Sequence, residues 1–170
     1  PLATDDDGNC IVILVDASNE QTICSGEIPS DLSANTGGST GSFSWSPSSD
    51  FVDSNLQDPV FVSSLTTTTT YTVTFIDDIN NCAVTDSVTI TVTPNTTPSF
   101  TTFGPYCSGS IIPVLPTTSI NGITGSWLPI VDNTVTTTYT FTPNSGQCAI
   151  TTNLIIFIDA LPTTGTILHN

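Results

Sequence analysis

The chain contains no Lys, no Arg and no Met, and it has a single His among its 170 residues. Its Asp and Glu residues therefore give a formal net charge of -15 with no basic side chain to balance it. Because proteins bind phosphate groups through Lys and Arg, this composition excludes nucleic acid and anionic membrane surfaces as partners. The lack of Lys and the single His also remove most side chains used in acid–base and nucleophilic catalysis, so we expect no enzyme activity and no catalytic residue.

The acidic composition does not indicate a disordered chain, because 37% of the residues are hydrophobic and only 9% are charged. Thr, Val, Ile and aromatic residues favour strands, whereas the strong helix formers are scarce or absent. No run of residues approaches the ~20 apolar residues that a membrane-spanning helix needs, so we expect no membrane insertion. The sequence predicts a folded, all-β chain.

An internal repeat accounts for most of the sequence. The segment Cys-Ser-Gly at residues 24–26 recurs at residues 107–109. Each copy is followed, in the same order, by a Trp-x-Pro segment, a Thr run that enters an alternating strand with a Tyr, and an x-Cys-Ala segment. These landmarks lie at residues 45–47, 66–75 and 81–85 in the first copy, and at residues 127–129, 136–142 and 147–151 in the second.

The landmarks divide the chain into repeat 1, residues 17–94, and repeat 2, residues 95–159. Residues 1–16 are interpreted as the end of a preceding repeat, because their Asp-Asp-Gly-Asn-Cys segment resembles the one around Cys82. Residues 160–170 are interpreted as a linker into a further repeat. The difference in length between the repeats falls between the Trp and the Thr run, where we expect a surface loop to absorb it.

Apolar and polar residues alternate with a period of two at residues 70–75 and 87–93, which is the pattern of half-buried strands. Shorter strands are predicted at residues 27–34, 42–46 and 60–65. About seven short strands in each repeat, separated by turn residues, predict an antiparallel β-sandwich.

The order of these landmarks resembles the Ig-like and PKD-like tandem repeats of very large surface proteins of Bacteroidota. Repeat 2, with its segments 121–127 and 137–143, is similar to repeats of the gliding-motility adhesin family. This resemblance implies tandem Ig-like/PKD-like β-sandwiches, export by type IX secretion, and a place on the outer face of a Gram-negative cell. It also implies a non-catalytic stalk or spacer in adhesion or gliding motility, with neighbouring repeats and other copies in a filament as partners.

Five Cys residues in a chain of this length fit an oxidising compartment. We predict that Cys24 bonds to Cys82 and Cys107 to Cys148, each pair within one repeat, and that Cys10 has its partner in the preceding repeat. The pairing of Cys24 with Cys82 requires that the end of the first strand and the start of the last strand lie close together in the sandwich. Zinc is a weak alternative, since the chain has no Cys-x-x-Cys pair and no His besides the one near its end.

Two binding functions remain as alternatives. Trp45, Trp127 or Tyr106 could stack on the faces of sugar rings, which would make the repeats polysaccharide-binding modules. Each Trp lies in the middle of an expected strand, however, and this position favours core packing. The acidic segments 5–7 and 77–78 could bind calcium, although Asp is also an ordinary turn residue and the spacing matches no known calcium loop. We therefore expect no cofactor, with calcium as the alternative.

Two expected strands are apolar at every position instead of alternating, at residues 154–158 and 11–15. Because an antiparallel sandwich buries one face of each strand, the second apolar face of these strands needs a cover. A loop of the same repeat is the simpler cover for residues 154–158, and the missing part of the preceding repeat is the simpler cover for residues 11–15. A neighbouring repeat or chain is the alternative, and it would make the stalk a laterally associated filament.

Overall fold

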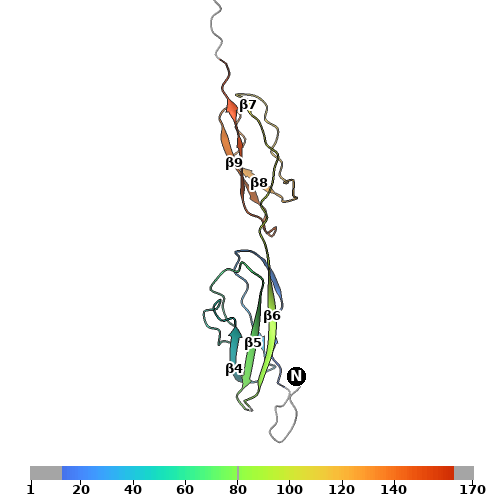
Figure 1. The fold of residues 1–170 in the computed structure, drawn as a ribbon, viewed down its shortest axis with the longest axis vertical. Helices are drawn as coiled ribbons and strands as arrows, with labels where there is room; N and C mark the ends of the chain where they lie inside the picture. Colours follow the sequence, from blue (N-terminus) through green and yellow to red (C-terminus); the bar gives the residue numbers. More distant parts are fainter. Residues whose placement is uncertain (1–12, 80, 163–170) are drawn as a thin grey trace, which may run out of the picture. The chain divides into compact units, whose positions relative to one another are not determined.

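The computed structural model describes residues 13–79 and 81–162, and the regular secondary structure of these residues consists of β-strands alone (Figure 1). The chain divides into two compact units, and the boundary along the sequence lies between Pro94 and Asn95. This is the point at which the sequence divides into its two copies, so the names repeat 1 and repeat 2 are kept for the units. Six of the described strands belong to repeat 1, β1 to β6, and five belong to repeat 2, β7 to β11.

The main sheet of repeat 1 has four strands in the order β2-β6-β5-β4. The strands predicted at residues 42–46, 70–75 and 87–93 are confirmed as parts of this sheet, and β4, β5 and β6 lie side by side in Figure 1. Two short strands pair separately beside it. The strand bounds are β1 (Asp16–Ala17), β2 (Gln21–Cys24), β3 (Ala34–Asn35), β4 (Gly41–Ser46), β5 (Thr69–Asp77) and β6 (Ala83–Thr93).

The strands predicted at residues 27–34 and 60–65 are wrong. Only Ala34 of the first segment lies in a strand, and Phe61 of the second makes an isolated bridge to Phe51. The amide of Phe61 donates its hydrogen bond to the side chain of Asp31 at 3.1 Å instead of to a strand. Short polar side chains that bond to backbone groups in this way compete with a sheet ladder, and apolar composition alone does not reveal them.

One strand pair of repeat 1 is parallel, where the sequence predicted an antiparallel arrangement throughout. Strand β2 runs alongside β6 with Gln21 opposite Ile90 and Cys24 opposite Thr93. The other pairs of the main sheet, β5 with β6 and β4 with β5, are antiparallel. Because β2 and β6 run in the same direction, the last residues of the two strands lie side by side.

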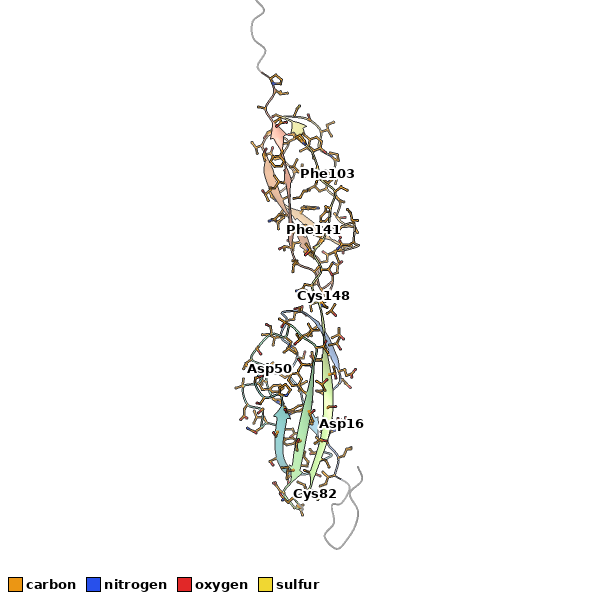
Figure 2. All side chains as sticks on the ribbon, viewed as in Figure 1. Asp16, Asp50, Cys82, Phe103, Phe141 and Cys148 are labelled. Atoms are coloured by element: carbon orange, nitrogen blue, oxygen red, sulfur yellow. The ribbon has the colours of Figure 1, made fainter. Side chains whose placement is uncertain are left out.

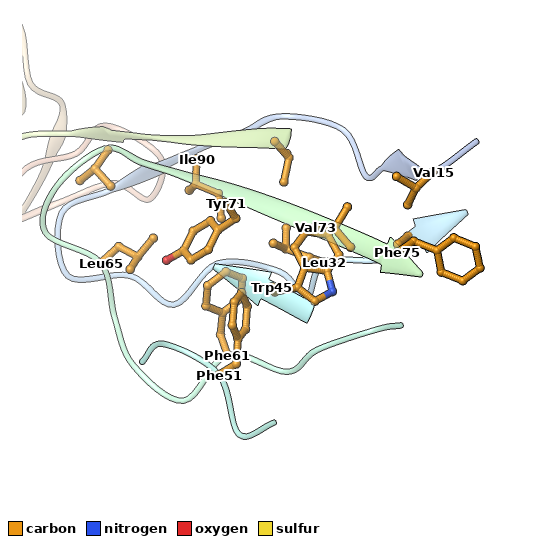
Figure 3. Close-up of a cluster of buried hydrophobic side chains, with 13 residues drawn as sticks. Val15, Leu32, Trp45, Phe51, Phe61, Leu65, Tyr71, Val73, Phe75 and Ile90 are labelled. Atoms are coloured by element: carbon orange, nitrogen blue, oxygen red, sulfur yellow. The ribbon is translucent and has the colours of Figure 1, made fainter. Parts of the chain in front are cut away.

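The core of repeat 1 lies on one face of this sheet (Figure 3). On β5 the side chains of Tyr71, Val73 and Phe75 are fully buried, as their alternation with Thr predicts. The ring of Tyr71 meets those of Phe51 and Phe61 edge-on, with centroids 5.1 and 5.4 Å apart. These two Phe residues come from the long segment between Trp45 and the Thr run, so this segment supplies core side chains and is more than a surface loop.

Repeat 1 also begins earlier than the sequence predicted. Val15 is buried in its core, and Ile13 packs against the same cluster. Strand β1 starts at Asp16 and pairs with β3 of repeat 1. Residues 13–16 therefore belong to repeat 1 and not to a preceding one, while residues 1–12 lie outside the described part of the chain.

Repeat 2 has a three-stranded antiparallel sheet in the order β10-β9-β8 and a short parallel pair, β7 with β11. Its core is small, with Leu115, Tyr139, Phe141 and Ile156 as the buried apolar side chains. The strand bounds are β7 (Tyr106–Cys107), β8 (Gly125–Leu128), β9 (Thr137–Pro143), β10 (Thr152–Ile156) and β11 (Ile158–Asp159).

The apolar run at residues 154–158 is divided between two strands. Strand β10 ends at Ile156 and β11 begins at Ile158, where it pairs with Tyr106 of β7. The outward side chains of this run are about half exposed, at 47% for Ile155 and 55% for Phe157. The expectation that a loop of the same repeat covers them is wrong, and cover by a neighbouring repeat or chain stays a prediction.

Candidate functional site

The cysteines are the residues for which the sequence predicted specific chemistry. Cys24, Cys82 and Cys148 are each disulfide-bonded, whereas Cys107 is a free and exposed thiol. The predicted bond between Cys107 and Cys148 is therefore wrong, because one of its two members is free. Cys10 lies outside the described residues.

The predicted bond between Cys24 and Cys82 is wrong for a geometric reason. Cys24 is the last residue of β2 and lies opposite Thr93, the last residue of β6. Cys82 directly precedes Ala83, where β6 begins, and Figure 2 shows it at the far end of that strand. A strand rises about 3.3 Å per residue, so the length of β6 separates the two sulfur atoms by far more than a disulfide allows.

The backbone around the two Cys-Ser-Gly segments is the same in both repeats. The amide of Ser25 donates to the carbonyl of Thr93 at 2.9 Å, and that of Ser108 donates to Asp159 at 2.8 Å. Gly26 and Gly109 follow with φ values of 91° and 82°. Only glycine adopts this left-handed conformation without strain, which explains why each segment ends in Gly. The Cys-Ser-Gly landmark is thus a turn that ends β2 in repeat 1 and β7 in repeat 2.

Trp45 is a core residue and is no candidate for sugar binding. It is 1% exposed, and its Nε1 donates to the carbonyl of Leu56 at 3.1 Å. The ring of Phe51 lies next to it, with centroids 6.3 Å apart. A sugar could reach this indole only if the core of repeat 1 opened.

Trp127 is half-buried and packs in a cluster of three rings. Its ring centroid lies 4.7 Å from that of Phe100 and 5.1 Å from that of Phe141, and its Nε1 donates to the carbonyl of Pro116 at 2.9 Å. Phe141 is labelled in Figure 2. Tyr106, the third residue considered for sugar binding, is also half-buried and packs against the core of repeat 2. Both rings are thus engaged in packing within their repeat.

A buried Tyr in an inner strand of each repeat is hydrogen-bonded to an acidic residue of a loop, and the sequence patterns did not predict this contact. The hydroxyl of Tyr71 donates to the carboxylate of Asp50 at 2.7 Å. Burial, together with this carboxylate, raises the pKa of Tyr71 above its usual value. In repeat 2 the hydroxyl of Tyr139 instead accepts from the backbone amide of Asp132 at 2.9 Å. The recurrence of a Tyr at the same place in the alternating strand of both repeats was the available signal.

The acidic residues do not assemble into a metal site in the described part of the chain. No three His, Cys, Asp or Glu side chains of residues 13–79 and 81–162 come together closely enough to hold an ion. Asp77 is buried at the start of the β5–β6 turn, and its carboxylate accepts from the amide of Ile79 at 3.1 Å. Of the residues considered for calcium and zinc, segment 5–7 and His169 lie outside the described residues.

Residues 15–94, which comprise repeat 1, match the family model of a domain of unknown function, DUF8696. Repeat 1 is thus similar to this domain, and the match includes Val15 and β1, which the structure also assigns to this repeat. Comparison with curated protein sequences gives no significant match. None of the described residues forms a helix of the length and apolar character that a membrane span requires.

Proposed function

We propose that this chain is a non-catalytic structural segment of a large secreted cell-surface adhesin or filament, in which its repeats act as a stalk or spacer. The observation that carries the proposal is that the residues that recur in both copies have structural roles. In both copies the Trp and the Tyr pack in the core, and the Cys-Ser-Gly segment forms the same turn. Residues that recur to build a core are typical of arrays in which each repeat is one structural unit.

Two further observations fit a place outside the cell. Cys24, Cys82 and Cys148 are disulfide-bonded, and such bonds persist in oxidising compartments. The absence of Lys and Arg leaves trypsin-like proteases without a cleavage site, which suits a protein exposed to its surroundings. The resemblance to gliding-motility adhesins points to export by type IX secretion and to a role in adhesion or gliding.

A replacement in the intact surface protein tests the proposal. Residues 13–159 would be exchanged for two unrelated β-sandwich repeats of similar length, and in a second strain they would be deleted. A spacer role predicts that the exchange retains adhesion and gliding while the deletion weakens them, with surface display of each variant checked by antibody labelling. Loss of adhesion after the exchange, despite normal display, would contradict the spacer role and favour a binding module.

The polysaccharide alternative has a direct test on the 170-residue chain. Binding to a glycan array, lost in Trp127→Ala but retained in Phe43→Ala, would support it, provided that circular dichroism shows both variants folded. We expect no specific binding, because the indole of Trp127 is packed between two Phe rings.

A further inference from the structure

The two Cys-Ser-Gly cysteines occupy equivalent positions but differ in their chemical state. Cys24 ends β2 opposite Thr93, and Cys107 ends β7 opposite Asp159, in both cases in a parallel pair with the last strand of the repeat. Their carbonyls accept from the amide three residues later at 3.0 Å in both repeats. Cys24 is nevertheless disulfide-bonded, whereas Cys107 is free and exposed.

Neither repeat bonds its two landmark cysteines to each other. In repeat 1 the length of β6 separates Cys24 from Cys82, although both are disulfide-bonded. In repeat 2 Cys148 is disulfide-bonded while Cys107 is free. A bonded cysteine at the Cys-Ser-Gly position thus has a partner other than the x-Cys-Ala cysteine of its own repeat. Likewise, a bonded x-Cys-Ala cysteine has a partner other than the Cys-Ser-Gly cysteine of its own repeat.

We propose that Cys107 is a linking thiol that forms a disulfide with the x-Cys-Ala cysteine of another repeat of the same kind. In repeat 1 the Cys-Ser-Gly cysteine and the x-Cys-Ala cysteine are both disulfide-bonded, but not to each other. Each of these two positions therefore bonds to a cysteine other than its counterpart in the same repeat, and a pair formed between two repeats satisfies both. The surroundings of Cys107 fit such a contact. Phe157, whose carbonyl accepts from the amide of Tyr106 at 3.0 Å, is 55% exposed, and Ile111 is 91% exposed. Another repeat seated at Cys107 would cover these apolar side chains.

Bond formation requires an oxidant, for which a small or protein disulfide serves. The Cys107 thiolate attacks one sulfur of the oxidant, forming a mixed disulfide and releasing the other sulfur as a thiol. The thiolate of the partner cysteine then attacks the Cys107 sulfur and displaces the second thiol of the oxidant. Two protons and two electrons leave the cysteine pair, and the oxidant disulfide is reduced to two thiols.

The test is disulfide mapping of the intact surface protein, isolated with its free thiols blocked by a maleimide. Because trypsin finds no site in this segment, the digestion uses pepsin or chymotrypsin. We expect the peptide that contains Cys107 to be linked to a peptide with the pattern Cys-Ala-Val/Ile-Thr, and to take up maleimide only after reduction. A Cys107 peptide that is alkylated before reduction, bound to a small thiol, or linked to a second Cys107 peptide would overturn the proposal.

Variants of the intact protein give an independent measurement. Cys107→Ser should remove the linked peptide and expose one new thiol on the partner repeat. The matched control Ser110→Ala, three residues away, should leave the link in place. If Cys107→Ser exposes no new thiol, the proposal is wrong.

The inference rests on the proposed role as one segment of a tandem array, and the mapping separates the two. If the intact protein contains no further repeat of this kind, the proposed role and the inference both fail. If it contains further repeats and Cys107 is nevertheless alkylated before reduction, only the inference fails.

Discussion

The two repeats share their landmarks but fill their cores in different ways. In repeat 1 the segment between Trp45 and the Thr run contributes Phe51, Phe61 and Leu65, and Trp45 is 1% exposed. In repeat 2 the corresponding segment is short, and Trp127 stays half-buried against Phe100, which comes from the segment before β7. The longer segment of repeat 1 looks like a loop insertion in the sequence, but it adds side chains to the core. We therefore expect repeat 1 to have the larger free energy of unfolding.

The largest expected effect comes from removing the ring that covers each Trp. Phe51→Ala should destabilise repeat 1 by about 3–5 kcal/mol, because a buried aromatic side chain leaves a cavity. The matched change in repeat 2, Phe100→Ala, should cost only about 1–3 kcal/mol, since this ring is half-buried.

Tryptophan fluorescence during urea denaturation measures the two repeats separately. Trp45 reports on repeat 1 in a Trp127→Phe background, and Trp127 reports on repeat 2 in a Trp45→Phe background. Each background also serves as the reference for its Phe→Ala variant. If the two Phe→Ala variants lost equal free energy of unfolding, this would contradict the idea that repeat 1 depends more on its inserted segment.

Two glycines test whether the repeats tolerate strand crowding equally. A Cβ on Gly41 would lie 2.2 Å from the carbonyl oxygen of Ile76, and one on Gly125 would lie 2.3 Å from that of Thr142. Both would also press on a buried Phe ring. Gly41→Ala and Gly125→Ala should each destabilise their repeat by about 1–3 kcal/mol, because backbone must move. Urea denaturation should show these losses, and an unchanged midpoint would show that the strands separate easily.

The exposed Ser that follows each of these glycines provides the control. Ser42→Ala and Ser126→Ala change a side chain in the same strands without bringing a Cβ against the neighbouring strand. Their unfolding free energies should stay within about 0.5 kcal/mol of the wild type. A large loss in either control would attribute the glycine effect to the strand position instead of to crowding.

The Tyr of each central strand should matter more in repeat 1 than in repeat 2. Tyr71→Phe removes a hydrogen bond to a carboxylate and should cost about 1.5 kcal/mol. Tyr139→Phe removes a hydroxyl that accepts from the backbone amide of Asp132 and donates to its carbonyl at 3.3 Å. Both partners are uncharged, so the change should cost about 1 kcal/mol or less. Denaturation of both variants checks the order, and a reversed order would contradict the role given to the Asp50 carboxylate.

Alkaline pH should reveal the Tyr71 contact separately. The pKa of Tyr71 is raised in the folded chain, so above the unfolded value of about 10 the unfolded state loses this proton first. The unfolding free energy contributed by Tyr71 should therefore be level below about pH 10 and fall as the pH rises above it. In Tyr71→Phe this decline should be smaller. An identical alkaline profile in the variant and the wild type would rule out the contribution.

The smallest effect concerns an exposed loop of repeat 2. The hydroxyl and the backbone amide of Thr134 donate to the Asp132 carboxylate at 2.6 and 2.7 Å, and they lower its pKa. Thr134→Val removes the hydroxyl donor, so the pKa of Asp132 should rise toward its ordinary value. NMR titration of the carboxyl carbons measures this shift, with Thr138→Val in the adjacent strand as the control. No change in the variant would show that the backbone amide alone holds the carboxylate.

The sequence by itself determined the repeat, the boundary after Pro94, the all-β class and the long strands β5 and β6. These features depend on local patterns. The two copies share residues in the same order, and strict alternation of Thr with Val, Tyr or Phe places all the apolar side chains on one face of a strand. The turn between β5 and β6 was visible for the same reason, since Asp and Asn favour turns.

Tertiary structure alone decided the parallel pairing of β2 with β6, the core role of Phe51 and Phe61, and the state of each cysteine. Strand direction depends on which partner a strand meets, and the residues of β2 do not encode that partner. The cysteine prediction failed as a consequence: a parallel β2 places Cys24 at the end of β6 and Cys82 at its beginning. Spacing along the chain shows which cysteines correspond between the repeats, but only the register of the sheet shows which sulfur atoms can meet.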